Sequence, residues 1–274
     1  MQHISGSIFR KDNIAKYLTE YKNNIPTPHL VIDNFLKTSS AEAILTNFKF
    51  NKNWINYSFI NNKEHYGLSD KNYMNEVSKE VFKELASKDF TDFISKVTDL
   101  KNIFLDESLD SGGLAQCLRG GKLNIHTDFN SHVIYKKWKR VLNVLIYLNK
   151  DWLDKYKGNL EFWDEKVKYP VKSIEPIFNR FLLFRTDKQS YHVYPDIIDC
   201  PPEMSRKCIN AWYFIEEEQN LKLYPTKYTP RPKDSFFYKL LIYLDTFLTK
   251  IFSFLKRNNL ITNEFASKIF NLFK

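Results

Sequence analysis

Residues 122–214 decide the fold of this chain and carry its chemistry. The stretch opens with Lys122-Leu-Asn-Ile-His-Thr-Asp-Phe129, continues through Ser190-Tyr-His-Val-Tyr-Pro195 and closes with Arg206-Lys-Cys-Ile-Asn-Ala-Trp-Tyr-Phe214. Side chains of an extended strand alternate between its two faces, so His126 and Asp128 project from the same side and can bind one ion together. If the fold brings His192 back to this pair, the three side chains form a metal site.

The donor types leave the identity of the metal open. Two imidazoles and one carboxylate occupy one face of an octahedron, which is the ligand arrangement of non-heme Fe(II) oxygenases. Zinc accepts the same donors, so the residues alone leave iron and zinc as alternatives. A lone His-x-Asp is also common in ordinary surface strands. The surrounding sequence is therefore needed to show whether these residues bind a metal, and which one.

The surrounding sequence matches a known pattern. Between the candidate ligands lie Arg140-Val-Leu-Asn-Val-Leu-Ile-Tyr-Leu-Asn-Lys-Asp-Trp152, Gly158-Asn-Leu-Glu-Phe-Trp163 and Asn179-Arg-Phe-Leu-Leu-Phe-Arg-Thr-Asp187. With them, residues 114–214 resemble the catalytic domain of the prolyl 4-hydroxylase-like Fe(II)/2-oxoglutarate dioxygenases. The resemblance implies iron, held by His126, Asp128 and His192. It also implies hydroxylation of a C–H bond, because related halogenases have a small residue in place of the acidic ligand.

The resemblance further implies a co-substrate site. Arg206 lies where the family binds the distal carboxylate of 2-oxoglutarate, and a planar guanidinium can pair with a carboxylate through two hydrogen bonds. Arg206 follows His192 by fourteen residues, a longer interval than the family has, which residues 199–203 explain as a longer loop. Tyr147 would support the same carboxylate, and Trp212 in the last strand completes the co-substrate residues.

Arg140, Trp163 and Tyr191 are the residues that the resemblance places toward the substrate. The alternatives are a salt bridge for Arg140 and core packing for the two aromatic side chains. Peptidyl proline is the first substrate class implied, with decarboxylation of 2-oxoglutarate to succinate. A free amino acid, another small metabolite or a lipid-linked envelope glycan stays open, because a fold does not fix a substrate. The implied cofactors are Fe(II), 2-oxoglutarate and O2, with ascorbate as a supporting reductant.

A non-catalytic jelly-roll binding module is the alternative of a different class. The joint presence of all three ligands and the arginine speaks against it. Two positions depart from the family pattern. The tyrosine usually found shortly before the first histidine is Cys117 here, so one contact of the co-substrate pocket is missing. The usual Gly-Gly is Gly158-Asn159, a milder change because asparagine also tolerates unusual backbone angles.

The hydrophobic pattern predicts an all-β core with flanking helices. Strands are predicted at residues 114–119, 122–129, 140–149, 160–163, 167–175, 180–185, 190–195 and 205–216. Eight short antiparallel strands are typical of a double-stranded β-helix, the cupin-like jelly roll.

Residues 1–113 are predicted to pack on that core. We expect a short helix or irregular arm over residues 1–25, and then a strand within 26–36 in which His29 is structural. A helix should begin at Thr38, where a hydroxyl precedes Glu42 at capping distance. Residues 49–72 are predicted as loop or irregular strand. Residues 75–100 should form one or two amphipathic helices with a break near Lys88.

The segment after the core reads as a linker and a tail. The catalytic core is expected to span residues 114–218, a proline-punctuated linker 219–233 and a helical tail 234–274. Apolar residues recur at spacings of three or four from Phe236 to Leu255, which predicts a wide-faced amphipathic helix. A second short helix is predicted at residues 263–273. Lys250 and Lys256 interrupt the tail too often for a spanning segment. The tail should pack on the core or on a second subunit, or lie as a basic helix on a membrane surface.

Charge and cysteine content limit the other classes. The formal net charge is +9, and residues 231–274 alone hold eight Lys and Arg against three acids, which is +5 of that total. The core is therefore not the basic part, and the case for nucleic acid is weak. Three cysteines without a Cys-x-x-Cys spacing predict neither a disulfide framework nor a zinc knuckle. With no apolar signal core in the first twenty residues, we expect a cytoplasmic protein, located at the inner face of the membrane if the tail binds lipid.

Overall fold

The computed structural model describes residues 1–58 and 60–262. Its helices are α1 (Lys11–Asn23), α2 (Thr38–Leu45), α3 (Glu76–Ala86), α4 (Lys88–Thr98) and α5 (Phe236–Arg257). Its strands are β1 (His29–Ile32), β2 (Ile55–Asn56), β3 (Asn62–Leu68), β4 (Phe104–Leu105), β5 (Gly113–Thr127), β6 (Trp138–Tyr147), β7 (Leu160–Trp163), β8 (Pro170–Ile174), β9 (Arg180–Arg185), β10 (His192–Tyr194), β11 (Ser205–Glu216) and β12 (Lys227–Tyr228). Short 3-10 helices lie at Gly6–Phe9, Thr46–Phe48, Lys71–Tyr73 and Asp154–Tyr156.

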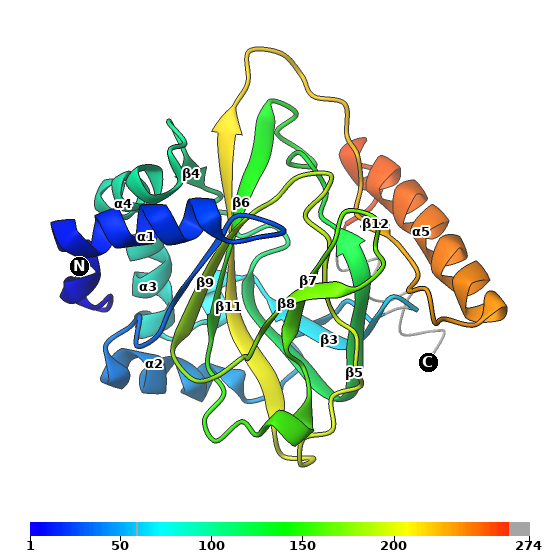
Figure 1. Ribbon diagram of the computed structural model, residues 1–274, viewed down its shortest axis with the longest axis horizontal. Coiled ribbons are helices and arrows are strands. Elements are labelled where there is room, and N and C mark those ends of the chain that lie inside the picture. The colour runs from blue at the N-terminus through cyan, green and yellow to red at the C-terminus, as the bar shows by residue number, and fades with distance from the viewer. Residues whose placement is uncertain (59, 263–274) are drawn as a thin grey trace.

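The strands form one curled antiparallel sheet with helices against it (Figure 1). Its main path runs β1-β9-β6-β11-β5-β10-β7-β8, while β3 and β12 also pair with β5. The long strand β5 belongs to two parts of the sheet, because residues 114–118 pair with β11 and His126 pairs with β10. Between these parts lies Gly120, whose φ of +85° is a left-handed conformation that glycine adopts without strain. The curled sheet is the predicted jelly roll.

Alternation along the central strands separates two cores. In β6, Val144 and Ile146 belong to the large outer core, whereas Leu145 and Tyr147 belong to a second cluster inside the curl. This is the period of two that a strand buried on both faces must show. The interior of the curl is therefore lined by every second residue of β6, β9 and β11.

The outer face is covered by α1, α3 and α4 (Figure 1). The hydroxyl of Tyr213 in β11 donates to the carbonyl of Leu85 in α3 at 2.8 Å. Phe90 of α4 contacts Phe181 of β9 and Phe35 edge-on. Because these helices cover the outer face of the sheet, a binding site on the sheet has to lie on its inner face, inside the curl.

Several predicted elements are confirmed and others need correction. The strands at 160–163, 180–185 and 205–216, and the break between α3 and α4 near Lys88, are confirmed. The strands predicted at 114–119 and 122–129 are one bent strand, and β3 lies in a region predicted to be irregular. The helix at Thr38 is confirmed, but its predicted cap is wrong. Thr38 is already the first helical residue, so the cap position is Lys37, which makes no side-chain cap hydrogen bond.

The segment after β11 contains a short strand that its proline-rich sequence did not predict. Within the predicted linker, β12 pairs with the end of β5 and sets Tyr228 opposite His126. The predicted tail helix is α5, and no helix of residues 1–58 and 60–262 is long and apolar enough to cross a membrane. The predicted helix at 263–273 lies outside the described residues.

Candidate active site

The three predicted metal ligands meet inside the curl. His192 lies directly opposite His126 in the pairing of β10 with β5, and Asp128 follows one residue after β5 ends. The Nε2 atom of His126 is 3.6 Å from Asp128 Oδ1, and that of His192 is 3.5 Å from Asp128 Oδ2. One ligand atom from each residue lies within 4.8 Å of the other two. Strand pairing, not sequence proximity, therefore assembles the set.

The hydrogen bonds of the two imidazoles prepare them for a cation. Nδ1 of His126 lies 2.9 Å from the carbonyl oxygen of Asn124, and Nδ1 of His192 lies 2.9 Å from that of Ser190. A carbonyl only accepts, so each Nδ1 carries the proton and each Nε2 keeps its lone pair toward Asp128. Burial, followed by the neighbouring His126, lowers the pKa of His192 to about 4. That histidine is therefore neutral at pH 7.

Asp128 is half-buried, but its Oδ2 atom is fully buried and has no hydrogen-bond partner. Burial raises its pKa, but His192, His126 and Arg140 outweigh burial and hold the pKa of Asp128 well below its usual range. An ionised, buried oxygen with no donor is costly unless a cation occupies the space before it. The donor set therefore fits a divalent metal.

Arg206 and Tyr147 form a second pair deeper in the curl. Arg206 donates from Nε to the carbonyl of Gly158 at 2.7 Å and from a terminal nitrogen to the Tyr147 hydroxyl at 3.2 Å. Burial raises the pKa of Tyr147 to about 12, so its phenol is protonated and can donate a hydrogen bond. The neighbouring Lys207, the other cation at this end of β11, donates to the Ser205 carbonyl at 3.2 Å and not to Tyr147. A guanidinium beside a phenol fits one end of a dicarboxylate.

Arg140 places a buried guanidinium without hydrogen bonds beside the three predicted metal ligands. Its guanidinium carbon lies 3.1 Å from the centre of the Phe129 ring and 3.4 Å from that of Trp212. None of its three side-chain nitrogens makes a hydrogen bond, and its nearest acid is Asp128 at 3.8 Å. Burial lowers the pKa of Arg140 to about 9, although Asp128 opposes this. The side chain is held by aromatic stacking, with its donors unused.

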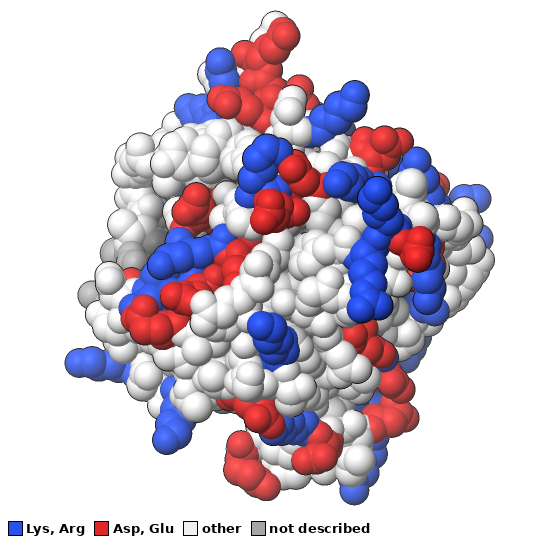
Figure 2. Space-filling view, turned by 90° about the vertical axis from the view of Figure 1, so that its left-hand side faces the viewer, with Lys and Arg blue, Asp and Glu red and all other residues white. Residues whose placement is uncertain are grey.

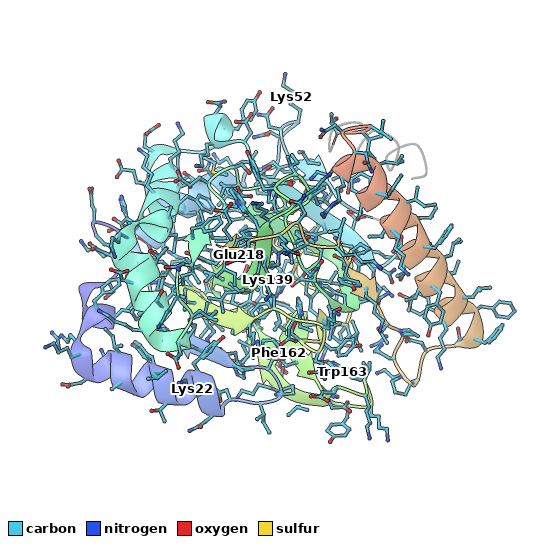
Figure 3. The ribbon with its side chains drawn as sticks, turned by 90° about the horizontal axis from the view of Figure 1, so that it is seen from above. Lys22, Lys52, Lys139, Phe162, Trp163 and Glu218 are labelled. Atoms are coloured by element: carbon cyan, nitrogen blue, oxygen red, sulfur yellow. The ribbon has the colours of Figure 1, made fainter. Side chains whose placement is uncertain are left out.

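Three predicted site residues are not where the prediction put them. Trp212 packs on Arg140 and donates to the Ser111 carbonyl at 2.9 Å, so it lies with a candidate substrate residue and not with the co-substrate pair. Trp163 and Tyr191 pack in a separate cluster with Ile125, Val167 and Val193. Phe162 belongs to the inner cluster, and Trp163, its neighbour on β7 (Figure 3), points to the opposite face by strand alternation. Core packing, the alternative for these two aromatic side chains, is what the structure shows.

Two residues that the sequence did not single out lie next to the co-substrate pair. Tyr194 is two residues after His192 in β10, and the Arg206 guanidinium lies 4.3 Å from the centre of its ring. His65 of β3 pairs with Cys117 in the sheet register. Burial, followed by Arg206 and His126, lowers the pKa of His65 to about 4. Strand alternation could have found Tyr194, whereas His65 lies in a segment without any period.

The linker strand supplies another side chain at the site. The Tyr228 ring centre lies 5.4 Å from that of His126, and the Thr229 amide donates to the Ile125 carbonyl at 2.9 Å. The segment after the core therefore forms one wall beside the triad.

Comparison with known proteins gives the class. Residues 112–214 match the family model of the 2OG-Fe(II) oxygenase superfamily. Prolyl hydroxylase EGLN3 of Mus musculus is 32% identical over 80 residues, which are 29% of this chain and 31% of that protein. Egl nine homolog 1 of Homo sapiens is 32% identical over 80 residues, which are 18% of its length. The chain thus spans less than a third of these curated relatives.

Solved structures share the fold. A prolyl hydroxylase from Trichoplax adhaerens, in complex with a hypoxia inducible factor oxygen degradation domain peptide fragment, has a TM-score of 0.53 at 22% identity and covers 75% of this chain and 93% of its own. A prolyl-4-hydroxylase of Pseudomonas putida has a TM-score of 0.51 at 10% identity, covering 73% and 99%. The α-ketoglutarate-dependent epimerase SnoN from nogalamycin biosynthesis has a TM-score of 0.50 at 9% identity, covering 84% and 89%. Identities this low show the fold alone.

Fold, site geometry and family match agree. Residues 112–214 are a 2OG-Fe(II) oxygenase domain. The curated relatives that match the chain are prolyl hydroxylases or Egl nine homologs, in keeping with the resemblance seen in the sequence.

Proposed function

We propose that this protein is an Fe(II)/2-oxoglutarate-dependent dioxygenase that hydroxylates a C–H bond of a prolyl or other amino-acid residue. The observation that carries the proposal is the convergence of His126, Asp128 and His192 to within 4.8 Å. The Arg206–Tyr147 pair faces the interior of the same curl. A metal site combined with an internal dicarboxylate pocket is what this reaction class needs.

The protein groups would hold the metal and leave part of its coordination sphere open. His126 and His192 present Nε2, and Asp128 presents the oxygen that has no partner. A bound Fe(II) with 2-oxoglutarate would supply the oxidising chemistry, with O2 consumed and succinate and CO2 released. The two backbone carbonyls that accept hydrogen bonds from the Nδ1–H groups fix the orientation of the imidazoles. Ascorbate is proposed as a supporting reductant.

Arg206 and Tyr147 would bind the distal carboxylate of 2-oxoglutarate. Arg206 is held in place by the Gly158 carbonyl, so little side-chain entropy is lost when the co-substrate binds. The negative carboxylate would also compensate a guanidinium that is otherwise buried among aromatic and cysteine side chains.

Arg140 is the proposed substrate contact. Its unbonded donors lie beside Asp128, between two aromatic rings. A peptide carbonyl or a carboxylate of the substrate would satisfy them. Peptidyl proline comes first because the relatives named above are prolyl hydroxylases. A small metabolite or a lipid-linked glycan is the alternative, since SnoN shares the fold without being called a prolyl hydroxylase.

Succinate release tests the activity. The purified protein should convert 2-oxoglutarate to succinate only with added Fe(II), and Asp128→Ala should abolish this because the protein loses its only anionic metal ligand. The exposed Asp89 on α4 provides the control Asp89→Ala, which should retain wild-type turnover. Iron-independent turnover, or equal turnover in both variants, would contradict the assignment.

Mass spectrometry separates the substrate classes. Peptides from a lysate treated with the wild-type protein should gain one oxygen atom on proline, and the same lysate treated with Asp128→Ala should not. A gain confined to small molecules assigns a metabolite substrate. The non-catalytic module predicts no change in either fraction and no succinate.

A further inference from the structure

Helix α5 is oriented with its apolar face away from the protein. Only Ile242, Asp245 and Thr246 are buried on its inner side. Phe236 is 76% exposed, Phe247 59% and Phe254 64%. The other large apolar side chains exposed along it are Phe237, Leu240, Leu241, Tyr243, Leu244, Leu248 and Ile251. Figure 3 shows the helix at the edge of the molecule, with side chains projecting outward.

Polar contacts fix this orientation. The Asn61 amide donates to Asp245 Oδ2 at 2.9 Å, and Asn124 bonds to the Tyr238 hydroxyl at 2.9 Å. At the other end, Lys256 pairs with Asp110 at 2.7 Å. Because hydrogen bonds and an ion pair seat the inner face, rotating the helix to bury its apolar side would leave these groups unpaired. The exposed apolar face is therefore built into the fold.

Cationic cavities lie at both ends of the helix. A cavity of about 550 Å³ before its first turn is lined by Lys122, Lys155, Lys157, Arg231 and Lys233, against Asp196 and Asp199. Of these two acids, Asp199 already pairs with Arg119. A second cavity of about 480 Å³ beside its last turns is lined by Lys136, Lys222, Lys250 and Arg257, with no acid, and by Leu221, Leu223 and Phe254.

We propose that α5 docks in the plane of an anionic phospholipid bilayer. Its apolar face would enter the boundary between headgroups and acyl chains, and the two cationic cavities would receive lipid phosphates. Its 22 residues make a rod of about 33 Å, at about 1.5 Å per residue. It lies on the membrane and does not cross it, in keeping with its exposed Lys250.

Charge favours a bilayer over a second copy of the chain. The one acid of α5, Asp245, is buried, so every charge that the helix presents to solvent is positive. A two-fold dimer places each surface against itself and would bring these like charges together. The face that carries the N-terminal helices instead shows Lys and Arg interspersed with Asp and Glu (Figure 2). The basic, apolar surface is thus a local property of α5 and its ends.

Vesicle flotation of the full chain tests the proposal. Wild-type protein should float with phosphatidylcholine vesicles that contain about one third phosphatidylglycerol. Its binding to pure phosphatidylcholine vesicles should be at least about tenfold weaker, because each Lys or Arg at an anionic surface changes binding about fivefold.

Two matched pairs of variants locate the surface. Phe247→Glu should reduce binding at least about tenfold, whereas Tyr169→Glu, equally exposed at 59% but remote in sequence, should not. Lys233→Glu with Lys250→Glu, one at each cavity, should remove the preference for anionic vesicles. Lys11→Glu with Lys52→Glu makes the same change in charge at exposed sites elsewhere and should leave the preference intact. All six substitutions in these four variants alter exposed side chains, so the fold should persist, and circular dichroism checks it.

Three results would overturn the proposal. The first is no flotation with either lipid mixture. The second is equal loss of binding in each variant and its control. The third is a dimer in sedimentation analysis that Phe247→Glu converts to a monomer without any effect of lipid, which would assign the face to a second copy.

Discussion

At the scale of single residues, the site is assembled by strand alternation and one long-range pairing. His126 and Asp128 share a face because they are two apart, and His192 reaches them because β10 pairs with β5 at that position. The shared face of His126 and Asp128 was predictable from the sequence alone, whereas the approach of His192 was predicted from the family resemblance. The stacking of Arg140 between Phe129 and Trp212 could not be predicted. It depends on the relation of β6 to β11 across a β-bulge near Phe214.

Tyr194 is expected to take over the contact that Cys117 cannot make. Its ring lies beside Arg206, and its face of β10 is also that of His192. Tyr194→Phe should raise the KM for 2-oxoglutarate several-fold, because a hydroxyl at the co-substrate pocket is lost, and should leave iron binding unchanged. Steady-state kinetics measure this.

Tyr191→Phe provides the control for that substitution. Tyr191 lies three positions before Tyr194 and packs in the cluster outside the curl, so its KM should equal that of the wild type. An unchanged KM in Tyr194→Phe would remove Tyr194 from the co-substrate site.

Gly158 positions Arg206 through its backbone. Its φ is +85°, and a Cβ added there would lie 3.0 Å from Cδ of Arg206. Gly158→Ala should therefore shift the guanidinium and weaken 2-oxoglutarate binding. It should also destabilise the fold by about 1 to 2 kcal/mol, the strain of a left-handed alanine.

Gly6→Ala is the matched comparison for Gly158→Ala, because a Cβ at Gly6 meets nothing within 4 Å. Calorimetric titration with 2-oxoglutarate should show weaker binding only in Gly158→Ala. Wild-type affinity there would mean that the Gly158 carbonyl does not hold Arg206 in its working position.

At the scale of secondary-structure elements, the local hydrophobic pattern predicted most strands. It failed for strands that form only because they pair with a strand distant in the sequence. The strands of the buried core were found because their apolar runs end at turn residues. The region of β3 was predicted only as loop or irregular strand, because residues 62–68 are mostly polar and gain their order from pairing with β5. β12 was missed because the prolines on either side of it, at positions 225, 230 and 232, suggest a linker, yet its two residues suffice to pair with the end of β5. The face of α5 that turns inward could not be predicted either, since its contacts are made by Asp245 and Tyr238.

The contact of α5 with the core should depend on pH through Asp245. Burial raises the pKa of this carboxyl to about 6, against the lowering effect of hydrogen bonds from Asn61. The folded protein thus keeps a proton that the unfolded chain has lost, so the stability that Asp245 contributes is complete below about pH 4 and is lost as pH rises through about 6.

Asp245→Asn tests this pH dependence because an amide cannot ionise. We expect the variant to exceed the wild type in unfolding free energy by about 2 to 3 kcal/mol near pH 8, and the difference to vanish near pH 4. Denaturant titrations at both pH values measure it, with Asp89→Asn as an exposed control. A difference that does not change with pH would show that folding does not raise the pKa of Asp245.

At the scale of the whole molecule, the curl separates two surfaces. Helices α1, α3 and α4 cover one face of the sheet, and α5 lies at the opposite edge (Figure 1). The segment from β11 to α5 passes beside the triad through Tyr228. A membrane-bound α5 would therefore be joined to the wall of the active site by seven residues. The composition of the tail predicted its basic character, but its outward apolar face became visible only in the structure.

The proposed activity requires one iron ion, which His126, Asp128 and His192 would hold together. Equilibrium dialysis against Fe(II) under anaerobic conditions, followed by metal analysis, should find one iron per chain in the wild type and in Asp89→Ala. His126→Ala, Asp128→Ala and His192→Ala should each lose nearly all of it. Stoichiometric iron in any of these three variants, or none in the wild-type protein, would contradict the central claim.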